Sequence, residues 1–172
     1  MKTINELRKE ASKFRELLNN CDKSNTKLVI DCFPIMSCKL SSMLLAYHFL
    51  KKWPNLELKG VSAATGKCEE ISHYWLEIDD IVIDITGDQY NMIDDNELNK
   101  KIIKNRPFPS VHVELISDSY LYNLFKIKEK EILILGFPNI RADFIEKMEI
   151  GYKQLLNSKA IEPIIRFSFN RK

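Results

Sequence analysis

The feature that most constrains the fold is the segment HYWLEIDDIVIDIT at residues 73–86, in which apolar and polar residues alternate on both sides of an Asp-Asp pair. This pattern predicts a β-hairpin whose two-residue turn is Asp79-Asp80. The turn pairs apolar residues across the two strands: Tyr74 with Ile85, Leu76 with Ile83, and Ile78 with Ile81. A slip of one residue would expose half of this apolar face, so the register is strongly specified.

The opposite face of the hairpin carries the residues that suggest chemistry. Because side chains alternate along a strand, this face holds His73, Trp75, Glu77, Val82, Asp84 and Thr86. His73 and Asp84 are diagonal neighbours across the two strands, at a separation that an imidazole and a carboxylate can bridge. A histidine oriented by a carboxylate is suited to act as a general base for a nucleophile. The candidate nucleophile is Cys38.

Cys38 is expected at the start of a helix that covers residues 38–52. Pro34 disfavours helix at the residue before it, so residues 32–37 should be extended or turned, and Ser37 is a suitable N-cap. The helix is apolar nearly all round, which indicates burial. A helix N-terminus favours the thiolate form of a cysteine, because the unpaired amides and the helix dipole attract negative charge.

These residues together allow acyl chemistry. His73 would take the proton of the thiol and later return it to a leaving group, while Asp84 would fix the tautomer of the imidazole. The amide of Cys38 and a second donor, for which Gln89 is the candidate, would stabilise an oxyanion. Trp75 shares the face of His73 and is a candidate wall of a substrate cleft.

Hydrophobic periodicity outlines the rest of the chain. Amphipathic helices are predicted at residues 3–19 and 141–156, with a short charged helix at 94–104. Strands are predicted at residues 56–63 and 111–116, and residues 27–32 read as either a strand or a buried segment. Residues 131–135 form a short apolar run, and residues 117–130 are ambiguous.

Composition is that of one ordinary globular domain spanning residues 1–172, with 45% hydrophobic and 29% charged residues. The formal net charge is +2 with no concentrated basic patch, so we expect no nucleic-acid partner. No stretch approaches the ~20 apolar residues of a spanning helix, and the N-terminus does not resemble a signal peptide. We therefore expect a cytoplasmic protein without membrane contact, with its four cysteines as thiols.

The order of helix-start cysteine, strand, histidine strand and aspartate strand resembles the transglutaminase-like branch of the papain-like cysteine enzymes. The segments that carry this resemblance are FPIMSCKLSSMLLAYHFL and HYWLEIDDIVIDITGDQY. The resemblance implies an α+β fold in which the cysteine helix packs on an antiparallel sheet, with Cys38, His73 and Asp84 as nucleophile, general base and orienting residue. It also implies thioester chemistry on a protein, peptide or small amide substrate, with neither cofactor nor metal.

Other interpretations of the same residues remain open. The domain could be a catalytically idle member of the fold that acts as a protein-binding module, or all three residues could be structural. Cys32, Cys38, Cys68 and His73 are potential zinc ligands, but their spacing lacks the paired short intervals of a zinc site, which makes zinc the weaker hypothesis.

Overall fold

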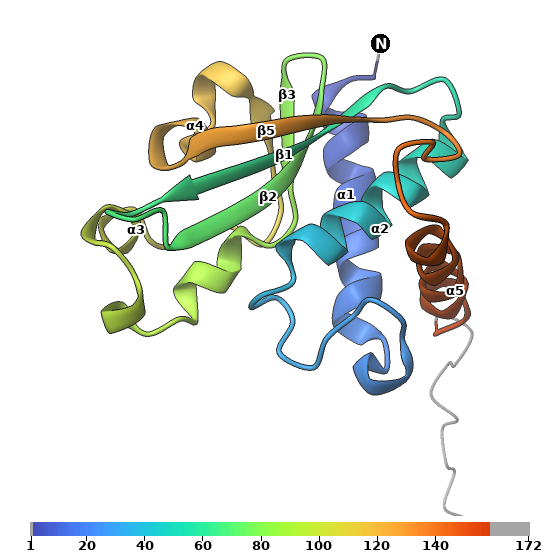
Figure 1. Cartoon of the computed structure of the whole chain (residues 1–172), viewed down its shortest axis with the longest axis horizontal. Helices are drawn as coiled ribbons and strands as arrows, with labels where there is room; N and C mark the ends of the chain where they lie inside the picture. The colour runs from blue at the N-terminus through green and yellow to red at the C-terminus, as the bar shows by residue number, and fades with distance from the viewer. Residues whose placement is uncertain (1, 159–172) are drawn as a thin grey trace, which may run out of the picture.

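The computed structural model describes residues 2–158, which form a mixed α+β fold built on one five-stranded antiparallel sheet (Figure 1). The order of the strands across the sheet is β4-β3-β2-β1-β5. Their bounds are β1 Leu58–Thr65, β2 Ile71–Ile78, β3 Ile81–Asp84, β4 His112–Leu115 and β5 Lys126–Leu133. Every neighbouring pair is antiparallel, which confirms the α+β class and the antiparallel sheet expected from the sequence.

Helices cover both faces of the sheet and bury a separate apolar core on each. The three long helices, α1 (Ile4–Asn20), α2 (Cys38–Lys52) and α5 (Ala142–Ser158), share the first core with the alternate residues Tyr74, Leu76 and Ile83. The short helices α3 (Lys100–Lys104) and α4 (Tyr120–Leu124) contribute to the second core, with Val61, Trp75 and Val82. Figure 1 shows α3 and α4 gathered at the end of the sheet away from α5. Four short 3-10 helices complete the secondary structure of residues 2–158: η1 Lys23–Asn25, η2 Gly87–Asn91, η3 Asp95–Glu97 and η4 Ile116–Asp118.

The first helix begins where the sequence provides a complete capping box. The Thr3 hydroxyl accepts a hydrogen bond from the Glu6 amide, and the Glu6 carboxylate accepts one from the Thr3 amide. Leu7, Ala11 and Phe14 then recur on one stripe and are fully buried against the sheet. The helix predicted at residues 3–19 is confirmed within one residue at each end.

The hairpin has the predicted turn and register. Leu76 lies opposite Ile83 and Ile78 lies opposite Ile81, with Asp79 in the left-handed conformation at φ 52°. Strand β3 ends at Asp84, so the predicted pairing of Tyr74 with Ile85 falls just beyond the paired residues.

The second face of the hairpin is also buried. Trp75, Val82 and Asp84 on this face are each 0% exposed. The hairpin is therefore a central layer of the protein, with a packed core on each side.

Helix α2 has the predicted bounds of 38–52, but the expected cap at its start is wrong. The Ser37 hydroxyl donates to the Pro34 carbonyl at 2.7 Å and makes no capping bond to α2. This contact ties Ser37 to the preceding turn, so the hydroxyl stabilises the loop that delivers Cys38 to the helix start.

Other local predictions differ from the structure in instructive ways. Residues 27–32 form turns, because Leu28 has a positive φ of 64° that no strand allows. The predicted helix at 94–104 is split into η3 and α3, with Asn99 capping the latter. The ambiguous residues 117–130 contain α4 and the first half of β5, while the apolar run at 131–135 includes the end of that strand.

Within residues 2–158, no helix is long and apolar enough to cross a bilayer.

Candidate active site

The structure brings Cys38, His73 and Asp84 together from three elements. Cys38 is the first residue of α2, His73 lies in β2, and Asp84 is the last residue of β3. His73 Nε2 lies 2.9 Å from Asp84 Oδ2, and Cys38 lies near enough to the His73 ring to contribute to the raised pKa of the imidazole. By the register of the hairpin Asp84 lies opposite Trp75, so β3 ends two residues before it reaches the level of His73.

Exposure differs sharply within this cluster. His73 is 1% exposed and Asp84 is 0% exposed, whereas Cys38 is partly exposed. Cys38 is therefore the one member of this cluster with substantial solvent-exposed surface, whereas the imidazole and the carboxylate are enclosed by protein.

Asp84 is held ionised by a full set of hydrogen-bond donors. Oδ1 accepts from the Thr86 amide at 2.9 Å and from the Thr86 hydroxyl at 3.1 Å, and Oδ2 accepts from His73 and, at 3.4 Å, from the Tyr120 hydroxyl. Burial by itself raises the pKa of this carboxyl, but His73 and the Thr86 amide outweigh that effect and hold the pKa of Asp84 below its ordinary value.

The contacts of His73 determine its tautomer. An ionised carboxylate only accepts hydrogen bonds, so Nε2 carries the proton that Asp84 receives. Nδ1 accepts from the Gln89 side-chain amide at 3.2 Å, which leaves it as the basic nitrogen of the neutral ring. Burial opposes the charged imidazolium, but Asp84 and Cys38 outweigh burial and raise the pKa of His73 above its ordinary value of 6.5.

Gln89 is the predicted oxyanion donor, and its amide group lies at the imidazole. Besides the bond to His73, its Nε2 donates to the Thr86 carbonyl at 3.0 Å. Gln89 belongs to η2, the short helix that follows β3 directly. The segment that follows the hairpin therefore places the Gln89 side chain against the His73 ring.

Trp75 is fully buried, 6.0 Å from the His73 ring between centroids, so it packs beside the imidazole instead of lining an open cleft. The expectation that Trp75 lines a substrate cleft is therefore wrong, because the second core covers this face of the hairpin. Its indole N–H donates to Glu77 at 3.1 Å.

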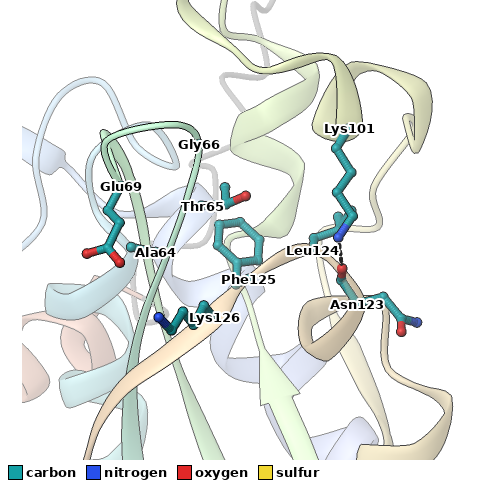
Figure 2. Close-up of a pocket in the computed structure, with 9 residues that line it drawn as sticks. All are labelled: Ala64, Thr65, Gly66, Glu69, Lys101, Asn123, Leu124, Phe125 and Lys126. Carbon is teal, nitrogen blue, oxygen red and sulfur yellow. Dashed lines mark hydrogen bonds between the residues drawn. The ribbon is translucent and has the colours of Figure 1, made fainter.

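Phe125, which the sequence analysis did not single out, covers the His73 ring with the centroids 5.5 Å apart. On its other side Phe125 lines a pocket of about 300 Å³ that opens between the β1–β2 turn and α3. Figure 2 shows the Phe125 ring below Thr65 in this pocket, with Lys101 reaching across to the Asn123 carbonyl. The ring thus separates this pocket from the imidazole.

Arg15 of α1 ties together the two loops that frame the cluster. Its guanidinium makes two bonds of 2.8 Å to the Asp88 carboxylate and one of 2.5 Å to the Ile85 carbonyl. It also lies 4.5 Å from the ring centroid of Phe33, in the loop before Cys38. Sequence reasoning missed Arg15, although it lies four residues after Ala11 on the buried side of α1, where a charged residue needs a partner.

Tyr120 and His112 form a second layer around Asp84. His112 lies directly opposite Asp84 in β4, and its ring packs at a tilt against Tyr120 with the centroids 4.4 Å apart. It also makes a 2.9 Å hydrogen bond to Ser119. Burial lowers the pKa of His112, so this histidine is neutral at pH 7. The ambiguous sequence around residue 120 gave no signal for this contact.

The zinc hypothesis gains no structural support. Within residues 2–158, no group of three or more His, Cys, Asp or Glu side chains is arranged to hold a metal ion. The four cysteines are free thiols, and Cys32 and Cys68 are exposed.

No protein-family model matches the chain. No curated protein and no solved structure matches it either. Functional inference for this protein therefore depends on the geometry of the site itself.

Proposed function

We propose that this protein is a cysteine-dependent enzyme of the transglutaminase-like kind, which transfers or hydrolyses acyl groups of a protein, peptide or small amide through a thioester on Cys38. One observation carries the proposal. A partly exposed cysteine at a helix start lies near enough to a buried imidazole to help raise its pKa, and that imidazole is hydrogen-bonded to a buried, ionised carboxylate.

In the first half of the reaction, the Cys38 sulfur attacks the carbonyl carbon of the amide. His73 Nδ1 has taken the proton of the thiol, and the resulting imidazolium is stabilised by Asp84. When the tetrahedral intermediate collapses, the carbon–nitrogen bond breaks. His73 gives its proton to the departing nitrogen, so an amine leaves and a thioester remains.

In the second half, water or an acceptor amine attacks the thioester carbonyl. His73 Nδ1 accepts a proton from the attacking group, and the carbon–sulfur bond breaks to release the acid or the new amide. The Cys38 thiolate and the imidazolium are thereby restored.

The oxyanion of each intermediate needs donors. The first amides of a helix have no intrahelical acceptor, and the Cys38 amide is one of them. The Gln89 amide supplies a second donor through a change that the proton transfer itself causes. Once Nδ1 is protonated it can no longer accept from Gln89, which frees one N–H of that side chain for the oxyanion.

The test is to trap the acyl-enzyme. The parent protein is incubated with p-nitrophenyl acetate, and intact and peptide mass spectrometry locate any acetyl group. We expect a rapid release of about one equivalent of nitrophenol per protein, an acetyl group on Cys38, and its removal by hydroxylamine, as a thioester requires.

Two serine variants serve as controls. Cys38→Ser is expected to abolish the rapid phase, whereas Cys68→Ser, which alters an exposed thiol, is expected to leave it unchanged. Acetylation of Cys38 no faster than that of Cys68 would refute the enzyme proposal and favour a catalytically idle domain that binds a protein partner.

A further inference from the structure

The Tyr120 hydroxyl shares one oxygen of the Asp84 carboxylate with His73. It donates to Oδ2 at 3.4 Å, and His73 Nε2 donates to the same oxygen at 2.9 Å. Thr86 supplies two donors to the other oxygen, Oδ1. The carboxylate therefore divides its negative charge among four donors, one of which is the imidazole that the proposed reaction uses.

The fold leaves room for this hydroxyl at Gly87, three residues after Asp84. A β-carbon added at Gly87 would overlap the Tyr120 hydroxyl oxygen and would lie 2.9 Å from Asp84 Oδ2, which is closer than real β-carbons approach such atoms. A side chain at this position would therefore push the hydroxyl away from the carboxylate.

The ring and the backbone of Tyr120 are both held in place. The ring packs against Phe108 at 5.0 Å and against His112 at 4.4 Å between centroids. Tyr120 is the first residue of α4, whose N-cap Ser119 is also hydrogen-bonded to His112. The hydroxyl is therefore presented to the carboxylate from a packed support.

The charge state of Tyr120 makes it a donor. Burial and the neighbouring Asp84 charge raise the pKa of Tyr120 above its ordinary value, so the hydroxyl keeps its proton at neutral pH. In a buried site, a donor hydrogen beside a carboxylate opposes the positive charge of an imidazolium on the same oxygen. The hydroxyl should therefore weaken the hold of Asp84 on the charged form of His73.

We propose that Tyr120 is a positioning residue, which limits how tightly Asp84 holds the His73 imidazolium and thereby helps that ring return its proton to the leaving group. This inference rests on the proposed function, because it concerns the proton transfer of the same histidine. A Tyr120 that served packing alone would have the opposite effect. Without its hydroxyl, Asp84 would be held less well and would bind the imidazolium less strongly.

The sign of the effect is tested by ¹⁵N NMR of the imidazole. The comparison is between Cys38→Ser and Cys38→Ser/Tyr120→Phe, so that no thiolate titrates together with His73. We expect the second change to raise the pKa of His73 by about 0.5 to 1 unit, the size of one hydrogen bond from a neutral donor. The resonance of the Nε2 proton should move to lower field, as in a stronger hydrogen bond.

The matched control is Tyr122→Phe in the same Cys38→Ser background. It makes the same change two residues further along α4, at a hydroxyl that donates to the buried Glu77 at 2.6 Å. Because Glu77 is not bonded to His73, both NMR signals should stay unchanged.

The other titratable groups near the imidazole and its carboxylate stay the same in this comparison. Tyr90 packs edge-on against the imidazole at 5.4 Å between centroids, and burial raises its pKa, so it is neutral. His112 is neutral at pH 7, and Asp88 is paired with Arg15. A changed titration of the imidazole therefore reports the lost hydroxyl.

Acetylation of Cys38 in the thiol-containing protein gives the functional readout. Phenyl acetate needs more help from a proton donor than p-nitrophenyl acetate, because phenolate is the poorer leaving group. We expect Tyr120→Phe to slow acetylation by phenyl acetate about twofold or more beyond any slowing with p-nitrophenyl acetate. Tyr122→Phe should leave the ratio of the two rates unchanged.

The outcomes separate this inference from the proposed function. A pKa of His73 that falls or stays the same in the Tyr120→Phe comparison, or equal slowing with the two esters, would overturn the assignment of Tyr120 and leave the enzyme proposal intact. If the parent protein were not acetylated on Cys38 by either ester, the proposed function would fail, and with it any catalytic role of Tyr120.

Discussion

Replacing Asp84 by asparagine preserves the shape of the side chain and removes the charge on which the cluster depends. The Thr86 amide and hydroxyl still find an oxygen acceptor at Oδ1, but the atom that faces His73 Nε2 becomes an NH₂ group. Two donors then face each other in a fully buried site. We therefore expect the His73 proton to move to Nδ1, which would remove the base for Cys38.

The size of this effect follows from the single bond that is lost. A buried hydrogen bond to a charged group contributes about 1.5 to 3 kcal/mol, so the free energy of unfolding at pH 6 should fall by that amount. At 1.36 kcal/mol for each pKa unit, the same loss lowers the pKa of His73 by about 1 to 2 units from its raised value.

The pH dependence of this difference has a definite sign. The pKa of Asp84 is lowered in the folded protein, so its contribution to stability is present above about pH 4 and is lost as the pH falls through that lowered pKa. The pKa of His73 is raised, so its contribution is fully present below about pH 6.5 and is lost as the pH rises through that raised pKa. The stability difference between parent and Asp84→Asn should therefore be largest between about pH 4 and 6.5.

Two measurements read out this prediction. Urea unfolding at several pH values gives the stability difference, and ¹⁵N NMR of the imidazole gives the tautomer and pKa of His73. Asp80→Asn makes the same chemical change at the exposed turn of the same hairpin and should alter stability by less than about 0.5 kcal/mol. A parent-like tautomer and stability in Asp84→Asn would refute the reasoning.

Two further predictions concern the residues around the cluster. Arg15→Lys keeps the charge but loses the paired bonds to Asp88, so we expect the free energy of unfolding to fall by about 1.5 to 3 kcal/mol in urea titrations. The control variant Arg8→Lys, at a half-exposed pair with Glu114, should lower it by less than about 1 kcal/mol. Equal losses in the two variants would contradict this prediction. Gln89→Met is expected to slow acetylation of Cys38 by about 10²- to 10³-fold in stopped-flow assays. Alkylation by iodoacetamide should change little, because alkylation forms no oxyanion. Parallel slowing of both reactions would argue against the oxyanion role of Gln89.

The parts of the site that the sequence predicted correctly depend on short-range patterns. The hairpin register follows from a period of two on either side of Asp79-Asp80, and α2 follows from a helix-length segment after Pro34 that is apolar on nearly all sides. The hairpin pattern alone places His73 beside Asp84, whereas the packing of the Cys38 helix against the sheet was an expectation from the family resemblance.

The residues that the sequence analysis missed act over long distances. Arg15 lies 73 positions from Asp88, and the only local hint was a charge on the buried side of α1. Phe125 and Tyr120 come from a segment whose helix is five residues long, too short to show a period of 3.6. The burial of Trp75 was also missed, because the second core that covers its face of the hairpin is built partly from the short helices α3 and α4.

The most direct test of the central claim is the rate of Cys38 alkylation by iodoacetamide between pH 5 and 10, compared within one protein with the exposed thiols Cys32 and Cys68. An ordinary thiol with a pKa of about 8.5 is almost wholly protonated at pH 6 and reacts slowly there. If His73 holds the proton of Cys38, this cysteine should react far faster than the other two at pH 6, and His73→Gln should remove the advantage. Reaction of all three thiols at similar rates across the pH range would contradict the Cys38–His73–Asp84 account.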